Sequence, residues 1–432
     1  MYFNEKAETM SQDELKNLQS QRLKEMVTRT YQNSPFYKKK MDEAGVHPDD
    51  IKSIDDLSKL PYTVKQDLRD TYPLGMLSVP NTDLVRIHAS SGTTGKPTVV
   101  AYTKNDIEVW AESAARALCC AEADKDSIVQ VAYGYGLFTG GLGLHYGVEY
   151  LGATAVPMSG GNTEKQLLLM RDLGSTHLAC TPSYAMNLGE ALSKTELGLE
   201  GIKLKGGIFG AEPWSQNLRE KIEEKLGITA LDIYGLSEIM GPGVAMECKN
   251  KQGLHIWEDH FAAEIIDPDT LEVLEDGQEG ELVITTITKE GLPLIRYRTR
   301  DLSTISREPC ACGRTHARIA RVKARSDDML IIRGVNVFPS QIESVILGVE
   351  GVDPHYEIIV SREGIMDVLE IRIELSANYE IDKISSLELL AKTLTNRLES
   401  VLGISSKIRL VESGSIQRFE GKAKRVTDMR KE

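Results

Sequence analysis

The sequence predicts an α/β fold, with a large multi-layered N-terminal domain that contains a β-rich subdomain and a small α+β C-terminal domain. Three observations carry this prediction. The chain has 432 residues, which at roughly 100 to 200 residues per domain suggests two or three domains. Short apolar runs alternate with helical patterns from about 84 to 290, as layered α/β proteins require. A charged stretch near 325–328 then separates this region from a segment with a different pattern.

The N-terminal domain begins with predicted helices over residues 5–44, where Leu15, Leu18, Leu23 and Met26 recur at roughly helical spacing. The strand-to-loop candidates that follow are VQVAYGYG, THLACTP, GGIFGAEP and ITALDIYG, and the helix candidates are EKQLLLMRDLG and SQNLREKIEEKLG. Residues 262–306 add several further strands, which predicts the β-rich subdomain.

The C-terminal domain is predicted from a boundary between residues 326 and 327, which divides the chain into 1–326 and 327–432. In the second part, HYEIIVSREGIMDVLEIRIEL predicts two strands around a turn that contains glycine. Residues 385–402 then have a helical pattern, and KIRLVE predicts another strand. This order is typical of a small α+β domain.

The composition limits the partners and the location that we expect. Acidic residues number 64 and basic residues 51, for a formal net charge of −13, so nucleic acid and anionic membranes are not expected partners. The most apolar stretch, 136–158, is rich in glycine and contains His145 and Glu149, which favours a buried strand–helix unit over a membrane span. Six cysteines are too few for a disulfide framework and favour a reducing cytoplasm.

The first motif with chemical meaning is the run from Ser90 to Pro97, SSGTTGKP. Small residues allow the backbone to approach a phosphate chain, hydroxyl groups donate hydrogen bonds to phosphate oxygens, and Lys96 adds positive charge. The run is not a Walker A loop, because Pro97 follows the lysine where that motif needs serine or threonine. A plain surface loop is the alternative, but the apolar runs on both sides favour phosphate binding.

Two further motifs, YGLSE at 234–238 and YRTRD at 297–301, contain an aromatic ring and carboxylates that could bind a ligand. Tyr234 offers its ring to a base, Gly235 leaves room for a ligand, and Glu238 offers the oxygen ligands that Mg²⁺ prefers. In YRTRD, the Asp301 carboxylate can accept hydrogen bonds from both hydroxyls of a ribose. The alternatives are a core tyrosine, an exposed glutamate at a helix start and a surface salt bridge.

A possible metal site lies in the cysteine-containing segments. Cys310 and Cys312 sit in a turn-rich stretch, and Cys248 and His255 lie upstream as Cys-x6-His. Together they are predicted to form a tetrahedral structural zinc site, and His316 competes as the fourth ligand. Unpaired buried thiols are the alternative, and this is the expected state of the remaining cysteines, Cys119, Cys120 and Cys180.

Taken together, the motifs resemble those of the phenylacetate–coenzyme A ligase family, within the adenylate-forming superfamily. The matching blocks run from about residue 30 to the end of the chain: PFYKKKMDEAGV, LPYTVKQDLRDTYPLGM, SSGTTGKPT, YGLSE, WEDHF, RYRTRD, RSDDMLIIRGVNVFPSQIE and EGKAKRV. The resemblance implies an acid–thiol ligase that uses ATP and Mg²⁺ to convert an aryl carboxylic acid, with phenylacetate expected, into an acyl-adenylate and pyrophosphate. Coenzyme A then displaces AMP and takes the acyl group. The resemblance also implies a homodimer.

The resemblance assigns the nucleotide site. Glu238 is expected to bind Mg²⁺, Asp301 to hold the ribose, and Lys422 to act as the catalytic lysine between the carboxylate and the α-phosphate, with Lys424 as the neighbour most easily mistaken for it. The other expected ATP and AMP contacts are Ser90, Ser91, Gly92, Thr93, Thr94, Gly95, Lys96, Ala211, Glu212, Pro213, Tyr234, Gly235 and Arg325.

The acyl site, the coenzyme A site and a hinge are assigned in the same way. The expected acyl-pocket residues are Tyr133, Gly134, Tyr135, Gly136, Leu137, Phe138, Ile239, Met240 and Pro242, although core packing would use the same residue types. Arg333, Gly334, Val335 and Asn336 are expected to line the pantetheine tunnel. Asp327 is the expected hinge, about which the C-terminal domain would rotate between the two half-reactions. Ala324 replaces the glycine that the family often has before Arg325.

Three alternative functions stay open at this point. A synthetase that resembles coenzyme F390 synthetase would pass the activated group to an acceptor other than coenzyme A. A catalytically silent scaffold would bind nucleotide only, which Glu238, Asp301 and Lys422 argue against. A conventional NTPase is opposed by Pro97 after the glycine–lysine pair.

Overall fold

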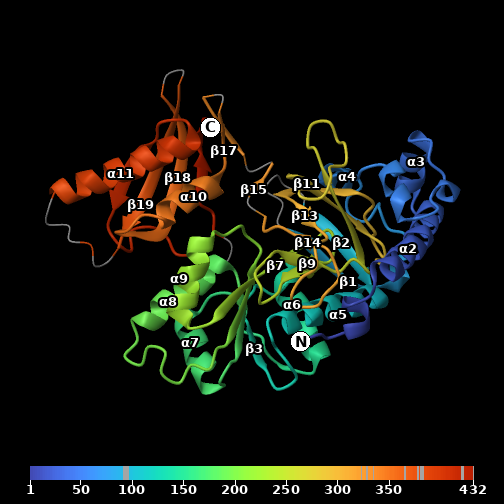
Figure 1. The fold of residues 1–432 in the computed structure, drawn as a ribbon, viewed down its shortest axis with the longest axis horizontal. Coiled ribbons are helices and arrows are strands. Elements are labelled where there is room, and N and C mark those ends of the chain that lie inside the picture. The colour runs from blue at the N-terminus through green and yellow to red at the C-terminus, as the bar shows by residue number, and fades with distance from the viewer. Residues whose placement is uncertain are drawn as a thin grey trace. The chain divides into compact units, whose positions relative to one another are not determined.

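The structure, a computed structural model, describes residues 1–90, 97–322, 324–326, 329–333, 335–363, 366–376, 379, 384–419 and 423–431 (Figure 1). Its contacts divide the chain into two compact units. The first unit comprises Met1–Thr181, Leu199–Ala211 and Gly227–Arg321, and the second comprises Pro182–Gly198, Glu212–Leu226 and Val322–Glu432. The expected division at 326/327 stays a prediction, since two short segments from the N-terminal half group with the C-terminal part of the chain.

The first unit begins with helices, as predicted for residues 5–44. They are α1 (Glu5–Glu8), α2 (Gln12–Asn33) and α3 (Pro35–Glu43). Helix α2 starts at a capping box in which Ser11 and Glu14 satisfy each other's backbone amides. Its buried face, which includes Leu15 and Leu23, packs into the main core. Shorter turns follow: η1 (Pro48–Asp50), η2 (Ile54–Lys59), α4 (Lys65–Asp70) and η3 (Asn81–Asp83).

A nine-stranded mixed sheet forms the centre of the first unit, with the strand order β13-β14-β9-β8-β7-β6-β5-β3-β4. The strands are β3 (Ile128–Val131), β4 (Thr154–Val156), β5 (His177–Cys180), β6 (Gly206–Gly210), β7 (Thr229–Leu236), β8 (Gly241–Glu247), β9 (Leu254–Ile256), β13 (Ile305–Ser306) and β14 (Arg318–Ile319). Strands β3 to β7 pair in parallel, whereas the remaining pairs are antiparallel. The carboxyl ends of the parallel strands therefore meet at one edge, where ligands bind in open α/β sheets.

Helices α5 (Lys104–Cys120), α6 (Thr139–Leu151) and α7 (Thr163–Asp172) belong to the same unit. The glycines of α6 allow it to lie close to α5: a Cβ added at Gly143 would stand 2.3 Å from the Trp110 ring, and one at Gly147 would stand 2.4 Å from Ala114. The apolar stretch 136–158 is thus a packed helix followed by strand β4. Among the described residues, no helix is long and apolar enough to cross a membrane.

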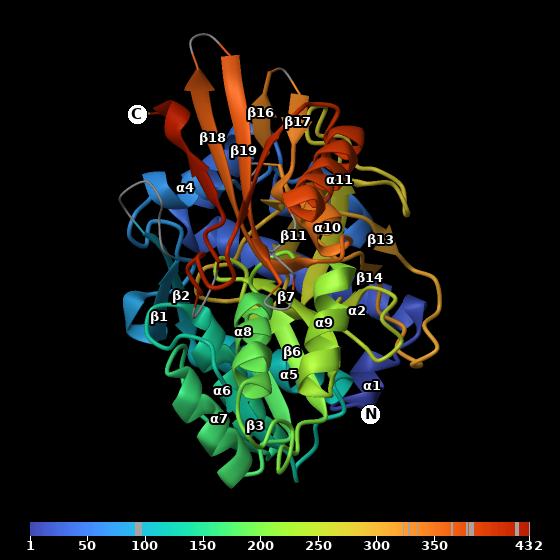
Figure 2. The same cartoon turned by 90° about the vertical axis from the view of Figure 1, so that its left-hand side faces the viewer.

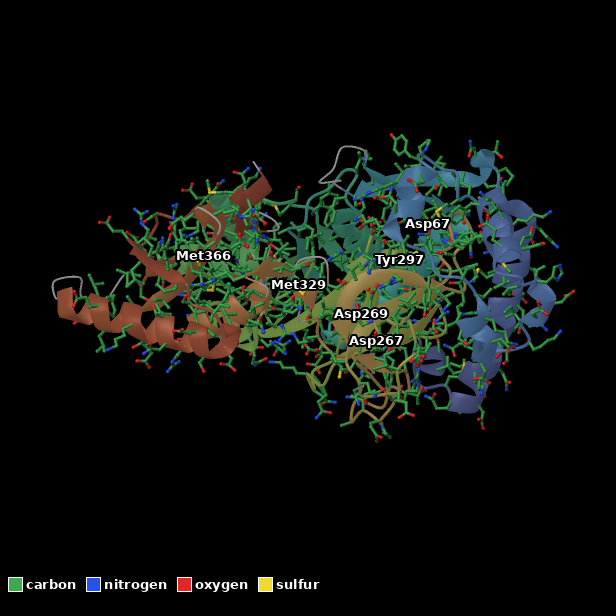
Figure 3. All side chains as sticks on the ribbon, turned by 90° about the horizontal axis from the view of Figure 1, so that it is seen from above. Asp67, Asp267, Asp269, Tyr297, Met329 and Met366 are labelled. Carbon is green, nitrogen blue, oxygen red and sulfur yellow. The ribbon has the colours of Figure 1, made fainter. Side chains whose placement is uncertain are left out.

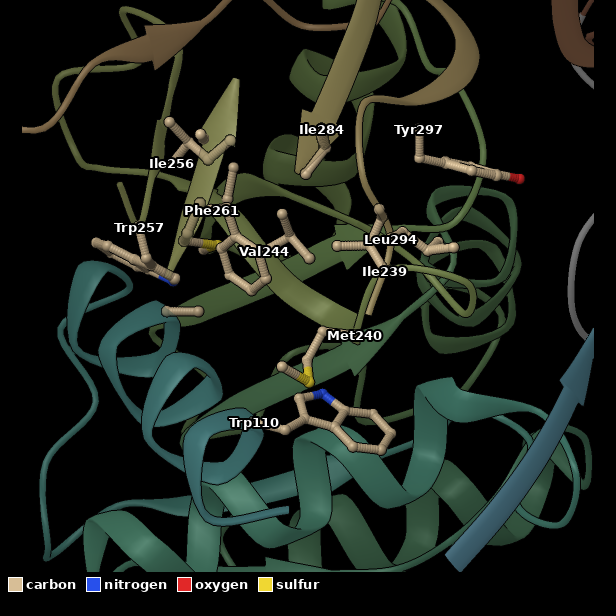
Figure 4. Packing of buried hydrophobic residues seen from close by; sticks show 14 of the residues in the cluster. Trp110, Ile239, Met240, Val244, Ile256, Trp257, Phe261, Ile284, Leu294 and Tyr297 are labelled. Carbon is tan, nitrogen blue, oxygen red and sulfur yellow. The ribbon is translucent and has the colours of Figure 1, made fainter. Parts of the chain in front are cut away.

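Two smaller sheets complete the first unit. Strands β1 (Leu84–Ser90) and β2 (Thr98–Thr103) form an antiparallel pair, and β10 (Phe261–Ile266), β11 (Gly280–Thr286) and β12 (Tyr297–Ser303) form an antiparallel sheet. The β-rich subdomain predicted for 262–306 is therefore confirmed. One hydrophobic core joins these sheets to the central one, and it includes Trp110, Trp257 and Phe261 (Figure 4).

The second unit is an α+β structure, as predicted. Its sheet has the order β20-β19-β18-β21. The predicted antiparallel pair is β18 (Val352–Glu363) and β19 (Met366–Leu375), which are labelled in Figure 2. The predicted KIRLVE strand is β20 (Lys407–Val411), which pairs with β19 in parallel. Its other elements are α8 (Pro182–Ser193), α9 (Gln216–Leu226), β15 (Ala324–Arg325), β16 (Leu330–Ile332), β17 (Val335–Val337), α10 (Pro339–Leu347), α11 (Ile384–Leu402), β21 (Val426–Asp428) and η4 (Met429–Lys431).

A buried ion pair anchors α5 to the segment before β10. The Arg116 guanidinium donates to both oxygens of Asp259, at 2.8 and 3.0 Å, and to Glu112 at 2.6 Å. Arg116 is 1% exposed and Asp259 is 2% exposed. Burial disfavours ionisation of Asp259, but His260 and Arg116 outweigh it and hold the pKa of that carboxyl below its usual range.

We predict that Arg116→Met lowers the free energy of unfolding by about 3–5 kcal/mol, because it leaves the Asp259 carboxylate buried without its charge partner. Arg307→Met is the matched control, since Arg307 pairs with Asp276 at the surface and its loss should cost about 1 kcal/mol or less. Urea unfolding at neutral pH measures both. Equal losses in the two variants would contradict the prediction. Because the pKa of Asp259 is lowered on folding, its stabilisation is present above an unfolded pKa of about 3.9 and is lost as the pH falls.

Candidate active site

Several of the predicted site residues meet at the carboxyl edge of the parallel strands. Tyr133 follows β3, Ala211 follows β6, and Glu238 follows β7. Ala211 has a φ of +72°, a left-handed conformation that is rare for a residue with a side chain and that reverses the chain at the end of β6. The strand ends therefore bring together residues that lie up to about a hundred positions apart in the sequence.

Tyr234 and Asp301, which come from two separately predicted motifs, are in direct contact. The Tyr234 hydroxyl on β7 donates a hydrogen bond of 2.6 Å to Oδ2 of Asp301 on β12. Asp301 is 7% exposed. This bond holds a tyrosine ring beside a carboxylate, whose oxygens have lone pairs that can accept further hydrogen bonds.

The glycine of the YGLSE motif, Gly235, allows two neighbouring strands to pack closely. A Cβ added at Gly235 would stand 1.8 Å from the carbonyl oxygen of Gly241, so only glycine allows β7 and β8 to approach at this point. We expected Gly235 to leave room for a ligand. The structure instead fills that space with the backbone of the neighbouring strand.

Glu238 is buried and paired with a lysine that the sequence did not single out. Its Oε1 lies 3.1 Å from Nζ of Lys65, and Glu238 is 4% exposed. Lys65 is the first residue of α4. The start of this helix is fixed by Asp67, which is labelled in Figure 3, because its carboxylate accepts from the backbone amide of Val64 and pairs with Lys40. The only sequence signal for Lys65 was its place in the LPYTVKQDLRD block. A lysine here counters the charge of Glu238 and offers a cation to a phosphate.

The predicted phosphate loop is described only at its ends. Ser91, Gly92, Thr93, Thr94, Gly95 and Lys96 lie outside the described residues. The loop joins β1 to β2, and Ser90 and Thr98 are cross-strand partners at its base. Ser90 Oγ and Thr98 Oγ1 are buried and have no hydrogen-bond partner among the described residues. Two such orphan hydroxyls at the mouth of the loop fit a site that receives acceptor oxygens.

The expected acyl-pocket residues differ in their surroundings. Ile239 and Met240 are fully buried, and Met240 lies next to Trp110 (Figure 4). On the other wall, Gly136 has a φ of +108°, and Phe138, which precedes α6, is 43% exposed. The two walls are connected by a 3.0 Å hydrogen bond between the hydroxyls of Thr139 and Ser237. Tyr133 is buried, the Tyr135 hydroxyl lies 3.4 Å from Nδ1 of His145, and Pro242 lies in β8.

The remaining predicted residues lie in the second unit. Arg333 adopts a left-handed turn and donates to the Ser405 hydroxyl at 3.0 Å, while Val335 and Asn336 begin β17. Glu212, which precedes Pro213, accepts from the backbone amides of Ser183 at 2.8 Å and Ala423 at 3.1 Å. Arg325 ends the short strand β15. Gly334, Asp327 and Lys422 lie outside the described residues.

The four predicted zinc ligands come together in the first unit. Ligand atoms of Cys248, His255, Cys310 and Cys312 all lie within 4.8 Å of one another. The sulfurs of Cys248 and Cys310 are 3.7 Å apart, and Cys312 Sγ is 3.3 Å from His255 Nε2. A tetrahedral ion with Zn–S bonds of about 2.3 Å would need an S–S edge of about 3.8 Å, so the donor set fits zinc.

The hydrogen bonds of His255 and His316 indicate which of the two is the fourth zinc ligand. His255 Nδ1 faces the carbonyl of His316 at 3.3 Å, which makes Nδ1 the donor and leaves Nε2 as a metal ligand. His316 uses both ring nitrogens elsewhere, on Ala7 O and on the backbone around Ile256 and Glu258. A hydrogen bond from Cys248, supported by His255, lowers the pKa of Cys312 against the effect of burial, and the pKa of Cys248 is raised in turn.

Two models of known protein families match most of the chain. The family model described as AMP-binding enzyme matches residues 4–288, and the model described as AMP-binding enzyme C-terminal domain matches residues 334–430. A phenylacetate–coenzyme A ligase from Escherichia coli is 54% identical over 98% of this chain and 97% of its own length. One from Thermus thermophilus is 47% identical over the full length of both chains.

Solved structures give the same result. A 2-hydroxyisobutyryl-CoA ligase in its postadenylation state, in complex with R3-HIB-AMP, superposes with a TM-score of 0.92 at 29% identity and covers 99% of this chain and 92% of its own. The same ligase in complex with 2-HIB-AMP and CoA in the thioesterification state gives a TM-score of 0.74 at 30% identity, with 100% and 93% coverage.

Proposed function

We propose that this chain, which belongs to the phenylacetate–coenzyme A ligase family of AMP-binding enzymes, is an acid–thiol ligase. It would activate phenylacetate with ATP and transfer the acyl group to coenzyme A. The observation that carries the proposal is the hydrogen bond between Tyr234 and Asp301. It joins the motif assigned to the base to the motif assigned to the ribose, close to the carboxyl edge of the sheet where Glu238 follows β7.

The first half-reaction replaces a poor leaving group on the acid with a good one. A carboxylate oxygen of the acid attacks the α-phosphorus of ATP, the bond to the bridging oxygen breaks, and pyrophosphate leaves. Asp301 and Tyr234 hold the ribose and the base, and the loop 90–96 with Lys65 holds the phosphates. Glu238 would bind Mg²⁺, which neutralises phosphate charge, and release of Lys65 from Glu238 would free the lysine for a phosphate oxygen.

The second half-reaction is thiol attack on the acyl carbonyl. The thiol sulfur of coenzyme A bonds to the carbonyl carbon, the bond to the AMP oxygen breaks, and the thiol proton is lost. We assign the pantetheine tunnel to Arg333, Gly334, Val335 and Asn336, and the hinge between the half-reactions to Asp327. The RGVNVFP block favours coenzyme A over the acceptor of a coenzyme F390 synthetase.

A panel of carboxylic acids tests the reaction. With ATP and Mg²⁺, arylacetates are expected to support exchange of labelled pyrophosphate into ATP, and with coenzyme A added they are expected to consume free thiol. Exchange without loss of thiol would point to another acceptor. A chain that binds AMP but supports no exchange with any acid would be the silent scaffold, and phosphate release without an acid would identify an NTPase.

The catalytic lysine is tested by separating the two half-reactions. Lys422→Ala is expected to lower the rate of adenylate formation by about 10²–10³-fold, because one preorganised charge at the α-phosphate is lost. Conversion of supplied phenylacetyl-adenylate to the thioester should continue. Lys424→Ala, which removes an exposed lysine two residues away, is the matched control and should retain both half-reactions. Equal loss of both half-reactions in Lys422→Ala would contradict the assignment.

We also propose that Cys248, His255, Cys310 and Cys312 bind a structural Zn²⁺. Three sulfurs and one imidazole nitrogen complete a tetrahedral set, so no position is open for catalysis. The ligand loops would be fixed to each other, and with them the N-terminal residues: the Tyr2 hydroxyl donates to Cys312 O at 2.7 Å, and Arg314 pairs with Glu8 at 2.7 Å.

Elemental analysis of the purified protein is expected to find about one zinc per chain. Cys312→Ser should lower both the zinc content and the melting temperature, since it removes one ligand of four. Cys180→Ala is the matched control: Cys180 is buried in β5 and is not one of the four clustered ligands, so zinc should be retained. A folded parent protein without metal would contradict the prediction. The homodimer and the cytoplasmic location stay predictions of the sequence.

A further inference from the structure

The loop that joins β7 to β8 and the start of β8 are held through their carbonyl groups by three buried side chains. The Tyr102 hydroxyl is within hydrogen-bond distance of Ser237 O at 3.1 Å and Met240 O at 3.2 Å. Lys289 Nζ donates to Glu238 O at 3.1 Å and Ile239 O at 2.8 Å. The Trp110 indole donates to Pro242 O at 3.0 Å. We refer to Tyr102, Trp110 and Lys289 as the carbonyl cradle.

The members of the carbonyl cradle also fix one another. The Tyr102 and Trp110 rings stack at 5.2 Å with an interplanar angle of 19°, and Lys289 Nζ stands 4.6 Å from the centre of the Tyr102 ring. All three side chains are at most 2% exposed. Asp106 anchors the residues after Lys289, because its carboxylate accepts from the amides of Glu290 at 2.6 Å and Gly291 at 2.9 Å.

A lysine is a costly residue at this position. Its ammonium group is fully buried and is met by two carbonyl oxygens rather than by a carboxylate. Burial lowers the pKa of Lys289 to about 8, although Asp106 and Glu238 oppose the shift. An apolar side chain of similar length would fill the volume without this cost. The arrangement is therefore better explained by what the ammonium group holds than by packing alone.

We propose that Lys289 is a positioning residue for the reaction, which acts by fixing the two consecutive carbonyls of Glu238 and Ile239. This inference rests on the proposed function and extends it. Glu238 is the assigned Mg²⁺ ligand, and Ile239 begins the assigned acyl wall that continues through Met240 and Pro242. One ammonium group thus sets the place of the metal-binding carboxylate and of the pocket wall together, and displacements of about 1 Å at such positions cost about 10²-fold in rate.

The test compares Lys289→Met with Tyr102→Phe, which removes only the hydroxyl and keeps the ring stack. In pyrophosphate exchange with Mg²⁺, ATP and phenylacetate, Lys289→Met is expected to lower kcat by about 10²-fold and to raise the KM for the acid by about 10-fold. Tyr102→Phe should change both in the same direction by severalfold, up to about 10-fold. Lys104→Met, at an exposed lysine at the start of α5, is the control and should match the parent protein.

Affinity for AMP separates positioning from general damage. The residues assigned to the base and the ribose of AMP, Tyr234 on β7 and Asp301 on β12, lie outside the loop, so the Kd for AMP in Lys289→Met should stay within about threefold of the parent value. A folded Lys289→Met protein with parental kcat and acid KM would overturn the proposal, and so would an equal loss of AMP binding and acid activation. If Lys289→Met does not fold, Tyr102→Phe decides: a parental acid KM overturns the proposal. Absence of exchange in the parent itself would overturn the proposed function, and this inference with it.

Discussion

The close approach of β7 and β8 is the constraint on which the site depends. At Gly235 the two strands leave no space for a Cβ atom, and at Gly241 a φ of +114° turns the chain over the Trp110 ring. The residues between these glycines are therefore forced into a compact loop at the carboxyl edge of the sheet. Their carbonyls face the carbonyl cradle, and Glu238 is held in a buried position opposite Lys65. The proposed roles of Glu238 in binding Mg²⁺ and of Ile239 and Met240 in the acyl wall therefore depend on this turn.

Buried charge is handled in two different ways in the first unit. Arg116 and Asp259 neutralise each other with paired hydrogen bonds and serve the fold. Lys289 and Glu238 belong to the proposed site, and neither has a matched bidentate partner: Lys289 is held by backbone carbonyls, and Glu238 faces a single lysine nitrogen. A carboxylate that is only loosely neutralised remains available to a metal ion, whereas one held as Asp259 is would not be.

Much of the fold was predictable, because hydrophobic periodicity and motif order report local structure. The N-terminal helices, the β-rich subdomain and the α+β character of the second unit are confirmed. The roles of Lys65, Tyr102 and Lys289 in the site were not predicted. In a sequence, a lone lysine is typical of a solvated surface residue, and a tyrosine in an apolar run is typical of a core residue. The choice between His255 and His316 was likewise open, because only the pairing of β9 with β14 places His255 opposite Arg318 and beside the cysteines.

The adjacency of Glu238 and Ile239 has a consequence for specificity. A peptide unit is rigid, so the carbonyl of Glu238 and the amide of Ile239 move as one body. A change that shifts the backbone of Ile239 therefore also shifts the backbone of Glu238, the residue whose carboxylate is assigned to Mg²⁺. Under the proposed assignments, the choice of acid and the rate of adenylation are coupled through this one loop. Under the same assignments, substitutions on the opposite wall, where Tyr135 is partly exposed and Phe138 is exposed, would alter specificity without moving this loop.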